Sequence, residues 1–143
     1  MRIDRNHARI AFFLVLWTFS FAVVTAAQDP PKSLVASAKG EGTIKFGKEE
    51  FKIYAVVVKL FEDGKAEINL VTDISVFVSG NWSRASETDK IVDLKITGGS
   101  VSGNLSGDGK ITLTDDRKSI ARLNLQVLNQ STRKTIKADF VAK

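Results

Sequence analysis

The stretch Phe51–Trp82, FKIYAVVVKLFEDGKAEINLVTDISVFVSGNW, has strand-forming residues on both sides of one clear turn signal, Asp63-Gly64. From Lys65 to Leu70 apolar and polar residues alternate, and a period of two residues is typical of a strand with one buried and one wet face. A glycine after an aspartate supplies the positive φ that tight hairpins require. The stretch therefore predicts antiparallel hairpins.

The same alternation continues to the end of the chain, and a first strand is predicted at residues 42–47. The predicted buried sets are Ile44 and Phe46; Ala66, Ile68 and Leu70; Ile74, Val76, Val78 and Trp82; Val92, Leu94 and Ile96; Ile111 and Leu113; Ala121, Leu123, Leu125 and Val127; and Ile136, Ala138 and Phe140. Further turns are predicted at Gly47-Lys48, Asp108-Gly109 and Asp115–Lys118, with a bend around Gly98-Gly99 and Gly103.

The connections between these strands are short. Parallel strands need a crossover of about a dozen residues or more, and the sequence offers none. We therefore expect an all-β domain, an antiparallel meander of about eight or nine strands, as an up-and-down barrel that closes its own edges. A two-sheet β-sandwich is the alternative.

The N-terminus has the order of features found in secretory signal peptides. Arginines at positions 2, 5 and 9 precede the apolar run Ile10–Val24, and the small residues Thr25–Ala27 follow it. We expect a signal peptide at residues 1–27, cleaved after Ala27 or alternatively after Ala26, then a linker at 28–32 and one domain at 33–143. A retained anchor is the alternative, because an apolar run of about 18 residues reaches the lower limit for a bilayer span.

Either outcome places the rest of the chain outside the cytoplasm, and we expect a secreted or periplasmic domain. With the signal peptide cleaved, membrane contact is only transient, through that peptide. Removal of residues 1–27 takes three of the 21 basic and one of the 16 acidic residues and leaves a net charge of +3. This small, mixed charge suits solubility better than nucleic-acid binding, so no nucleic-acid partner is expected. The many lysines are predicted to form a mixed-charge face with interleaved acids.

The chain lacks the residues that most catalytic and metal sites use. It has no cysteine, and its single histidine, His7, lies in the predicted signal peptide. Ser-His-Asp and Cys-His nucleophile systems and the usual zinc ligands are therefore absent from the mature part. The adjacent acids Glu49-Glu50 and Asp115-Asp116 are predicted to point to opposite faces or into solvent. We expect a protein that is not an enzyme and that has no metal or other cofactor.

Tyr54–Val58, YAVVV, breaks the alternation. The segment is either a central strand covered on both sides or a strand that crosses a bend; alternatively, one of its faces contacts a ligand or partner. Candidate contact residues are Tyr54, Val56, Val58, Phe77 and Trp82. Trp82 is either a core plug at the barrel end or a ring at the mouth of a cavity.

Three Asn-x-Ser sequences begin at Asn81, Asn104 and Asn129. In a eukaryotic source they are candidate glycosylation sites.

The function expected from these features is that of an exported, non-enzymatic binding domain for a small apolar ligand or a protein partner. The alternative is a structural or accessory envelope domain with a filled core and no ligand. An open interior lined by Val57, Leu70, Val78 and Trp82 favours an internal ligand, whereas a filled interior favours a structural or docking role. The sequence leaves the oligomeric state open.

Overall fold

The structure is a computed structural model that describes residues 33–143, and in this range every regular element is a β-strand. The predicted signal peptide at 1–27 and linker at 28–32 lie outside the described residues. The strands are β1 (Leu34–Phe46), β2 (Glu49–Leu60), β3 (Lys65–Val71), β4 (Val76–Ser83), β5 (Ile91–Gly99), β6 (Leu105–Leu113), β7 (Ile120–Asn129) and β8 (Lys134–Ala142). In the described range no helix is long and apolar enough to cross a membrane.

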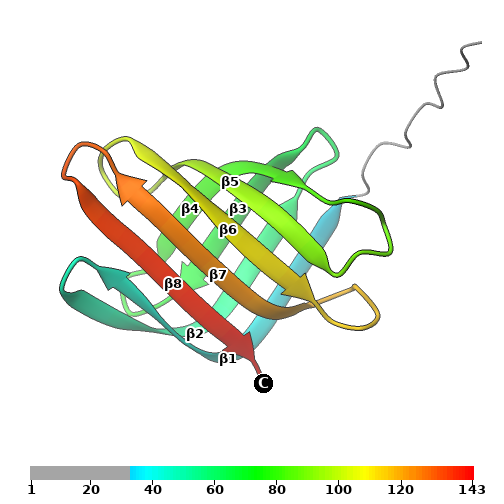
Figure 1. Cartoon of the computed structure of the whole chain (residues 1–143). Helices are drawn as coiled ribbons and strands as arrows, with labels where there is room; N and C mark the ends of the chain where they lie inside the picture. Colours follow the sequence, from blue (N-terminus) through cyan, green and yellow to red (C-terminus); the bar gives the residue numbers. More distant parts are fainter. Residues whose placement is uncertain (1–32) are drawn as a thin grey trace, which may run out of the picture.

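Each strand pairs antiparallel with the next one along the chain, and β8 pairs with β1, so the sheet closes into a barrel (Figure 1). The predicted all-β meander is confirmed, and the barrel rather than the sandwich is the architecture. Closure leaves most strands with a partner on both sides, which satisfies their backbone N–H and C=O groups within the fold.

Apolar side chains fill the inside of the barrel. Every second residue points inward, and inward residues from all eight strands belong to one buried cluster. Large side chains such as Phe140 and Ile44 are almost wholly buried, and each contributes about 1.5–3 kcal/mol through burial. Glycines in β1 make room for them, since a Cβ at Gly40 would lie 2.9 Å from the Phe140 ring. The interior is therefore a packed core.

The two ends of the barrel carry different sets of loops. At the first, the plugged end, lie the β2–β3, β4–β5 and β6–β7 turns (residues 61–64, 84–90 and 114–119) and the start of β1. At the second, the mouth, lie the β1–β2, β3–β4, β5–β6 and β7–β8 turns (residues 47–48, 72–75, 100–104 and 130–133). Up-and-down connectivity brings segments far apart in sequence together at each end (Figure 1).

The hairpin predicted at Asp108-Gly109 is wrong, because both residues lie inside β6. Asp108 points outward and forms an ion pair with Lys95 of β5. Gly109 lies on the inner wall, where a Cβ would be 2.4 Å from Leu125 Cδ2. This glycine serves close packing rather than a turn.

The first half of β1 was not predicted, since the first strand starts at Leu34 instead of residue 42. Ile74 also differs from its prediction: it lies in the β3–β4 turn and is exposed rather than buried.

The irregular segment Tyr54–Val58 marks a change of phase in β2. Ile53 and Val56 are both buried, although three positions separate them, and the β1–β2 register shifts opposite Tyr54, between Lys39 and Gly42. Two residues of β1, Gly40 and Glu41, lie opposite the single residue Tyr54 at this irregularity, and the alternation of β2 changes phase there. The predicted alternative of a central strand covered on both sides is wrong, because Tyr54 is 50% exposed.

Candidate functional site

The mouth carries an opening that is lined in part by large apolar side chains. Its cavity volume is about 570 Å³, within the range of about 300–1,000 Å³ typical of small-molecule sites. All four turns at this end, or the strand ends beside them, contribute to the lining. The apolar residues are Phe46, Phe51, Ile74, Val76, Val101 and Ile136; the polar ones are Ser75, Ser100, Ser102, Asn129 and Thr132, with Glu49 and Lys134.

An aromatic pair forms one wall of the mouth. Phe46 and Phe51 flank the Gly47-Lys48 turn, and their rings meet edge to face with centroids 5.9 Å apart and planes at 71°. Such pairs contribute about 0.5–1.5 kcal/mol beyond their buried area. Both rings are only partly buried against the core. The wall is therefore held in place while part of its surface stays accessible.

Ile74 forms a second part of the mouth, and it is 58% exposed. The turn that presents it is ordered: Ile74 N–H donates to Thr72 Oγ1 at 3.1 Å, and Ser75 N–H donates to the Thr72 carbonyl at 3.4 Å. Ser75 has φ of 47°, in the left-handed region that non-glycine residues seldom adopt. The local backbone thus fixes a large apolar side chain in an exposed position.

Asn129 ties two mouth loops together. Its side chain is 3% exposed; Nδ2 donates to the Ser102 carbonyl at 2.8 Å, and Oδ1 accepts from the backbone N–H groups of Ser131 and Thr132. Gly103 has φ of 115°, and a Cβ there would lie 2.5 Å from Asn129 Oδ1. The β5–β6 and β7–β8 turns are therefore joined by a buried amide.

The contact residues predicted in Tyr54–Val58 do not share one face. Val56 and Val58 are buried inside the barrel, whereas Tyr54 is exposed on the outer wall. Phe77 is partly buried on that wall, in register with Asn69 of β3, which pairs in turn with Val57 of β2. Tyr54 and Phe77 are therefore the only two of these four residues on the outer wall, because Val56 and Val58 point inward.

Trp82 lies at the plugged end and matches its core-plug alternative. The side chain is 7% exposed, and its Nε1–H donates to the Phe61 carbonyl at 2.8 Å. Its backbone N–H also donates to the Gly64 carbonyl at 2.8 Å. The opening beside it, bordered by Leu34 and Leu60, has a volume of only about 190 Å³. The indole N–H is thus already bonded within the protein.

The three sequons differ in accessibility. Asn81 and Asn104 are exposed. Asn129 is buried with its amide nitrogen donating a hydrogen bond, so a glycan on it is incompatible with this structure.

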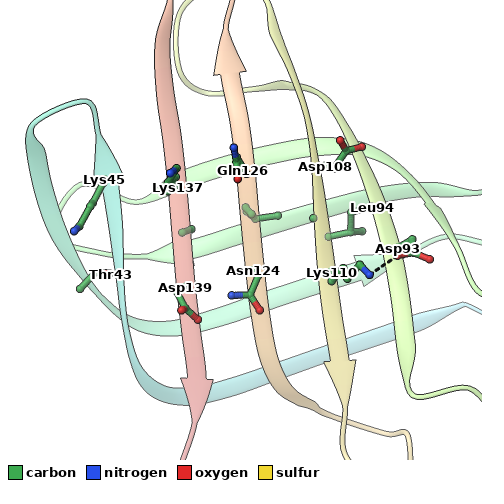
Figure 2. Close-up of a pocket in the computed structure, with 13 residues that line it drawn as sticks. Thr43, Lys45, Asp93, Leu94, Asp108, Lys110, Asn124, Gln126, Lys137 and Asp139 are labelled. Carbon is green, nitrogen blue, oxygen red and sulfur yellow. Dashed lines mark ion pairs between the residues drawn. The ribbon is translucent and has the colours of Figure 1, made fainter.

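A wide depression of about 900 Å³, lined mainly by polar and charged residues, lies on the outer wall of β1 and β5–β8 (Figure 2). Ion pairs between strands cross this wall: Lys95 with Asp108 at 2.9 Å, Lys110 with Asp93 at 4.0 Å, and Arg122 with Asp139 at 3.2 Å. The mixed-charge face predicted from the sequence is confirmed. Exposed pairs of this kind are each worth about 0–1 kcal/mol.

The carboxyl groups with displaced pKa values are all shifted downward. The Lys143 ammonium, by hydrogen bond and charge, lowers the pKa of Glu41, and Lys90 does the same to Asp115. The pKa of Asp116 is lowered first by the Thr114 hydroxyl and then by the Lys118 backbone N–H. Each of these acids is stabilised as an anion, the opposite of a general acid. Among residues 33–143 no three His, Cys, Asp or Glu side chains gather in a way that could hold a metal ion.

No family model matches the chain, and neither a curated protein nor a solved structure gives a significant match. Functional inference therefore depends on the geometry of the barrel itself.

The mouth residues carry a signal in the sequence. Phe46 and Phe51 flank a two-residue turn, and Ile74 is a large apolar residue between two polar ones in a turn. Apolar residues next to turns at the same end of a meander are a sign of an apolar mouth.

Proposed function

We propose that this chain is an exported, non-enzymatic binding module that holds a small apolar ligand at the mouth of the barrel. The observation that carries the proposal is the combination of the half-buried Phe46–Phe51 wall with the exposed Ile74 over an opening of about 570 Å³. When a ligand covers a water-exposed apolar surface of this kind, binding is stabilised by about 25 cal/mol per Å² of apolar area removed from water.

The ligand sits at the mouth rather than deep inside the barrel. The inward residues from every strand form one packed cluster, and Leu70, Val78 and Trp82, which would line an open interior, are part of it. Val57 is instead partly buried on the outer wall. A filled interior supports a shallow site, closed from below by residues such as Val76 and Ile136.

The polar groups of the mouth favour a largely neutral ligand. The hydroxyls of Ser75, Ser100 and Ser102 border the apolar surface, and the charged side chains in the lining, Glu49 and Lys134, have opposite signs. Hydroxyls can orient a single polar group on the ligand, while two opposite charges give little net attraction for an ion.

Titration with a neutral fluorescent probe, N-phenyl-1-naphthylamine, tests the proposal. We expect saturable binding that Ile74→Ser weakens about fivefold or more, because the substitution removes apolar contact area from the mouth. Val35→Ser is the matched control, since Val35 is 71% exposed on the outer wall at the opposite end. Both side chains are exposed, so both variants should keep the stability of the parent within about 0.5 kcal/mol.

Absence of probe binding, or equal weakening by Val35→Ser, contradicts the proposal and supports the alternative, a structural or accessory envelope domain. The filled core is the observation that favours this alternative. Native mass spectrometry of the protein released by its host adds a second test, because it reports the cleavage position after Ala26 or Ala27, any retained ligand and the number of subunits.

A further inference from the structure

The barrel has one incomplete seam, where β1 runs on past the end of β8. β1 pairs with β2 from Leu34 to Phe46, but it pairs with β8 only from Gly40 to Phe46. Beyond β8, the Lys143 N–H donates to the Lys39 carbonyl at 3.0 Å. On that side, residues 34–38 of β1 have no strand partner within the described range (Figure 1).

The register identifies the backbone groups that face this gap. The Lys39 carbonyl points toward β8, and in an antiparallel strand the N–H and C=O groups of every second residue point to the same side. The N–H and C=O of Ser37 and Val35 therefore face the gap. An edge with unpaired backbone groups is a template for an added strand.

The gap is a recess with small side chains around it. Its volume is about 580 Å³, and we call it the seam notch. The notch is lined by residues 37–39 of β1, Thr114, residues 119–121 around the start of β7, and residues 141–143 around the end of β8. Three of its lining residues, one from each of these strands, are alanines: Ala38, Ala121 and Ala142. Their short side chains leave room for a side chain that enters from outside.

We propose that the seam notch binds an extended peptide segment of a partner protein by strand addition along β1. The segment runs antiparallel to β1 and so continues the line of β8. Strand addition obtains affinity from main-chain hydrogen bonds and specificity from alternate side chains. One face of the segment places an apolar side chain toward Ala38.

The other face of the segment lies beside Lys39 and Val35. Lys39 is exposed and has no ion pair within residues 33–143, so an acidic residue there complements its charge. Val35, 71% exposed, offers apolar contact further along. A recess also favours a single strand over a second copy of the barrel, because the β6–β7 turn and the end of β8 border the edge of β1 and hinder two such edges from meeting.

The test uses a fluorescent peptide of about six residues that alternates glutamate and valine, with an N-methylated version as control because it cannot donate the backbone hydrogen bonds. Ser37→Pro removes the N–H that faces the notch, and proline is tolerated on an edge strand. We expect it to weaken binding about tenfold, as the loss of one or two hydrogen bonds does. Ser37→Ala keeps the N–H and should bind within about twofold of the parent.

Peptide binding should also slow hydrogen exchange at the Ser37 amide, and Lys39→Glu should weaken binding because it reverses the charge beside the acidic residue. Equal binding by Ser37→Pro and the parent, equal binding of the N-methylated peptide, or no binding would overturn the proposal. A concentration-dependent dimer that Ser37→Pro abolishes would overturn it too, in favour of a second copy as the occupant. The site is separate from the mouth, so naphthylamine binding should be the same in both Ser37 variants.

Discussion

The two ends of the barrel hold their turns with different chemistry. At the plugged end each of the three turns uses a carboxylate: Asp63, Asp89 and Asp116 each accept a hydrogen bond from a backbone N–H two residues later, at 3.0 Å. At the mouth the corresponding acceptors are neutral, namely the hydroxyls of Thr72, Ser131 and Thr132 and the Asn129 amide. The charged acceptors keep water close to the plugged end, whereas the neutral acceptors leave the mouth apolar.

The ends also differ in how they cover the core. Trp82 closes the plugged end with a buried ring whose N–H is satisfied, while the mouth leaves Phe46 and Phe51 partly exposed and Ile74 largely exposed. Under the proposed function, the plugged end contributes stability and the mouth presents the surface that binds the ligand. A site that keeps apolar groups in water gives up stability that burial would provide.

Removal of the plug should have the largest effect. Trp82→Ala should lower the free energy of unfolding by about 3–5 kcal/mol, because it opens a cavity under the plugged end. Phe51→Ala at the mouth should cost less, about 1–2 kcal/mol, because the ring is only partly buried. Urea unfolding followed by circular dichroism measures both; Trp82 is the only tryptophan in residues 28–143, so tryptophan fluorescence cannot follow its variant.

Trp82→Phe separates the two contributions of the plug. It keeps most of the ring but removes the Nε1–H that donates to the Phe61 carbonyl. Because that carbonyl still accepts from the Gly64 N–H, the cost should be that of one hydrogen bond, about 0.5–1.5 kcal/mol. A larger loss in Phe51→Ala than in Trp82→Ala would break the comparison, since the mouth would then be the end that stabilises the barrel.

The buried amide at the mouth should have the next largest effect. Asn129→Ala leaves the Ser102 carbonyl and the Ser131 N–H without their partner and should lower the free energy of unfolding by about 1–3 kcal/mol. Naphthylamine binding should also weaken, because the β5–β6 and β7–β8 turns are no longer joined. Asn124→Ala, on the exposed outer wall of the same strand, is the control and should change stability by less than about 0.5 kcal/mol. Unchanged probe binding in Asn129→Ala would show that the mouth does not depend on this amide.

The fold could be predicted where the alternation is carried by large side chains. β3, β5 and β8 each place three apolar residues on the buried face, and these were identified correctly. The first half of β1 was missed because its inward residues after Leu34 are Ala36, Ala38 and Gly40, which give little hydrophobic contrast. These residues are small because large side chains from other strands, such as Phe140, pack against them. The pattern within one strand cannot reveal such a partner.

The candidate sites were harder to predict because they depend on register and on which loops meet. A single bulge opposite Tyr54 decides that Val56 and Val58 point inward. The mouth unites Phe46, Ile74 and Val101, which come from three different turn regions of the chain, and the seam notch depends on where β8 ends relative to β1. Neither kind of information is present in the spacing of residues along one strand.

The smallest predicted effect is the loosening of one turn at low pH. It tests directly the difference between the charged acceptors of the plugged end and the neutral acceptors of the mouth. The pKa of Asp116 lies below its usual value of 3.8, because the Thr114 hydroxyl at 2.6 Å and the Lys118 N–H at 3.0 Å stabilise the anion. A lowered folded-state pKa means that the contribution to stability is present above the unfolded pKa and is lost as the pH falls through the folded one. The β6–β7 turn should therefore loosen below about pH 3.8, whereas the β7–β8 turn should not.

Hydrogen exchange measures this difference at two matched amides, once each rate is divided by its intrinsic rate at the same pH. The protection of Lys118 N–H, bonded to Asp116, should fall between pH 5 and pH 2.5, while that of Lys134 N–H, bonded to the Thr132 hydroxyl, should stay constant. Asp116→Asn should remove the pH dependence at Lys118, because the amide oxygen still accepts the bond but does not titrate in this range. Equal loss of protection at both amides would mean that acid loosens the whole barrel, and the chemistry of the turn anchors would then not distinguish its two ends.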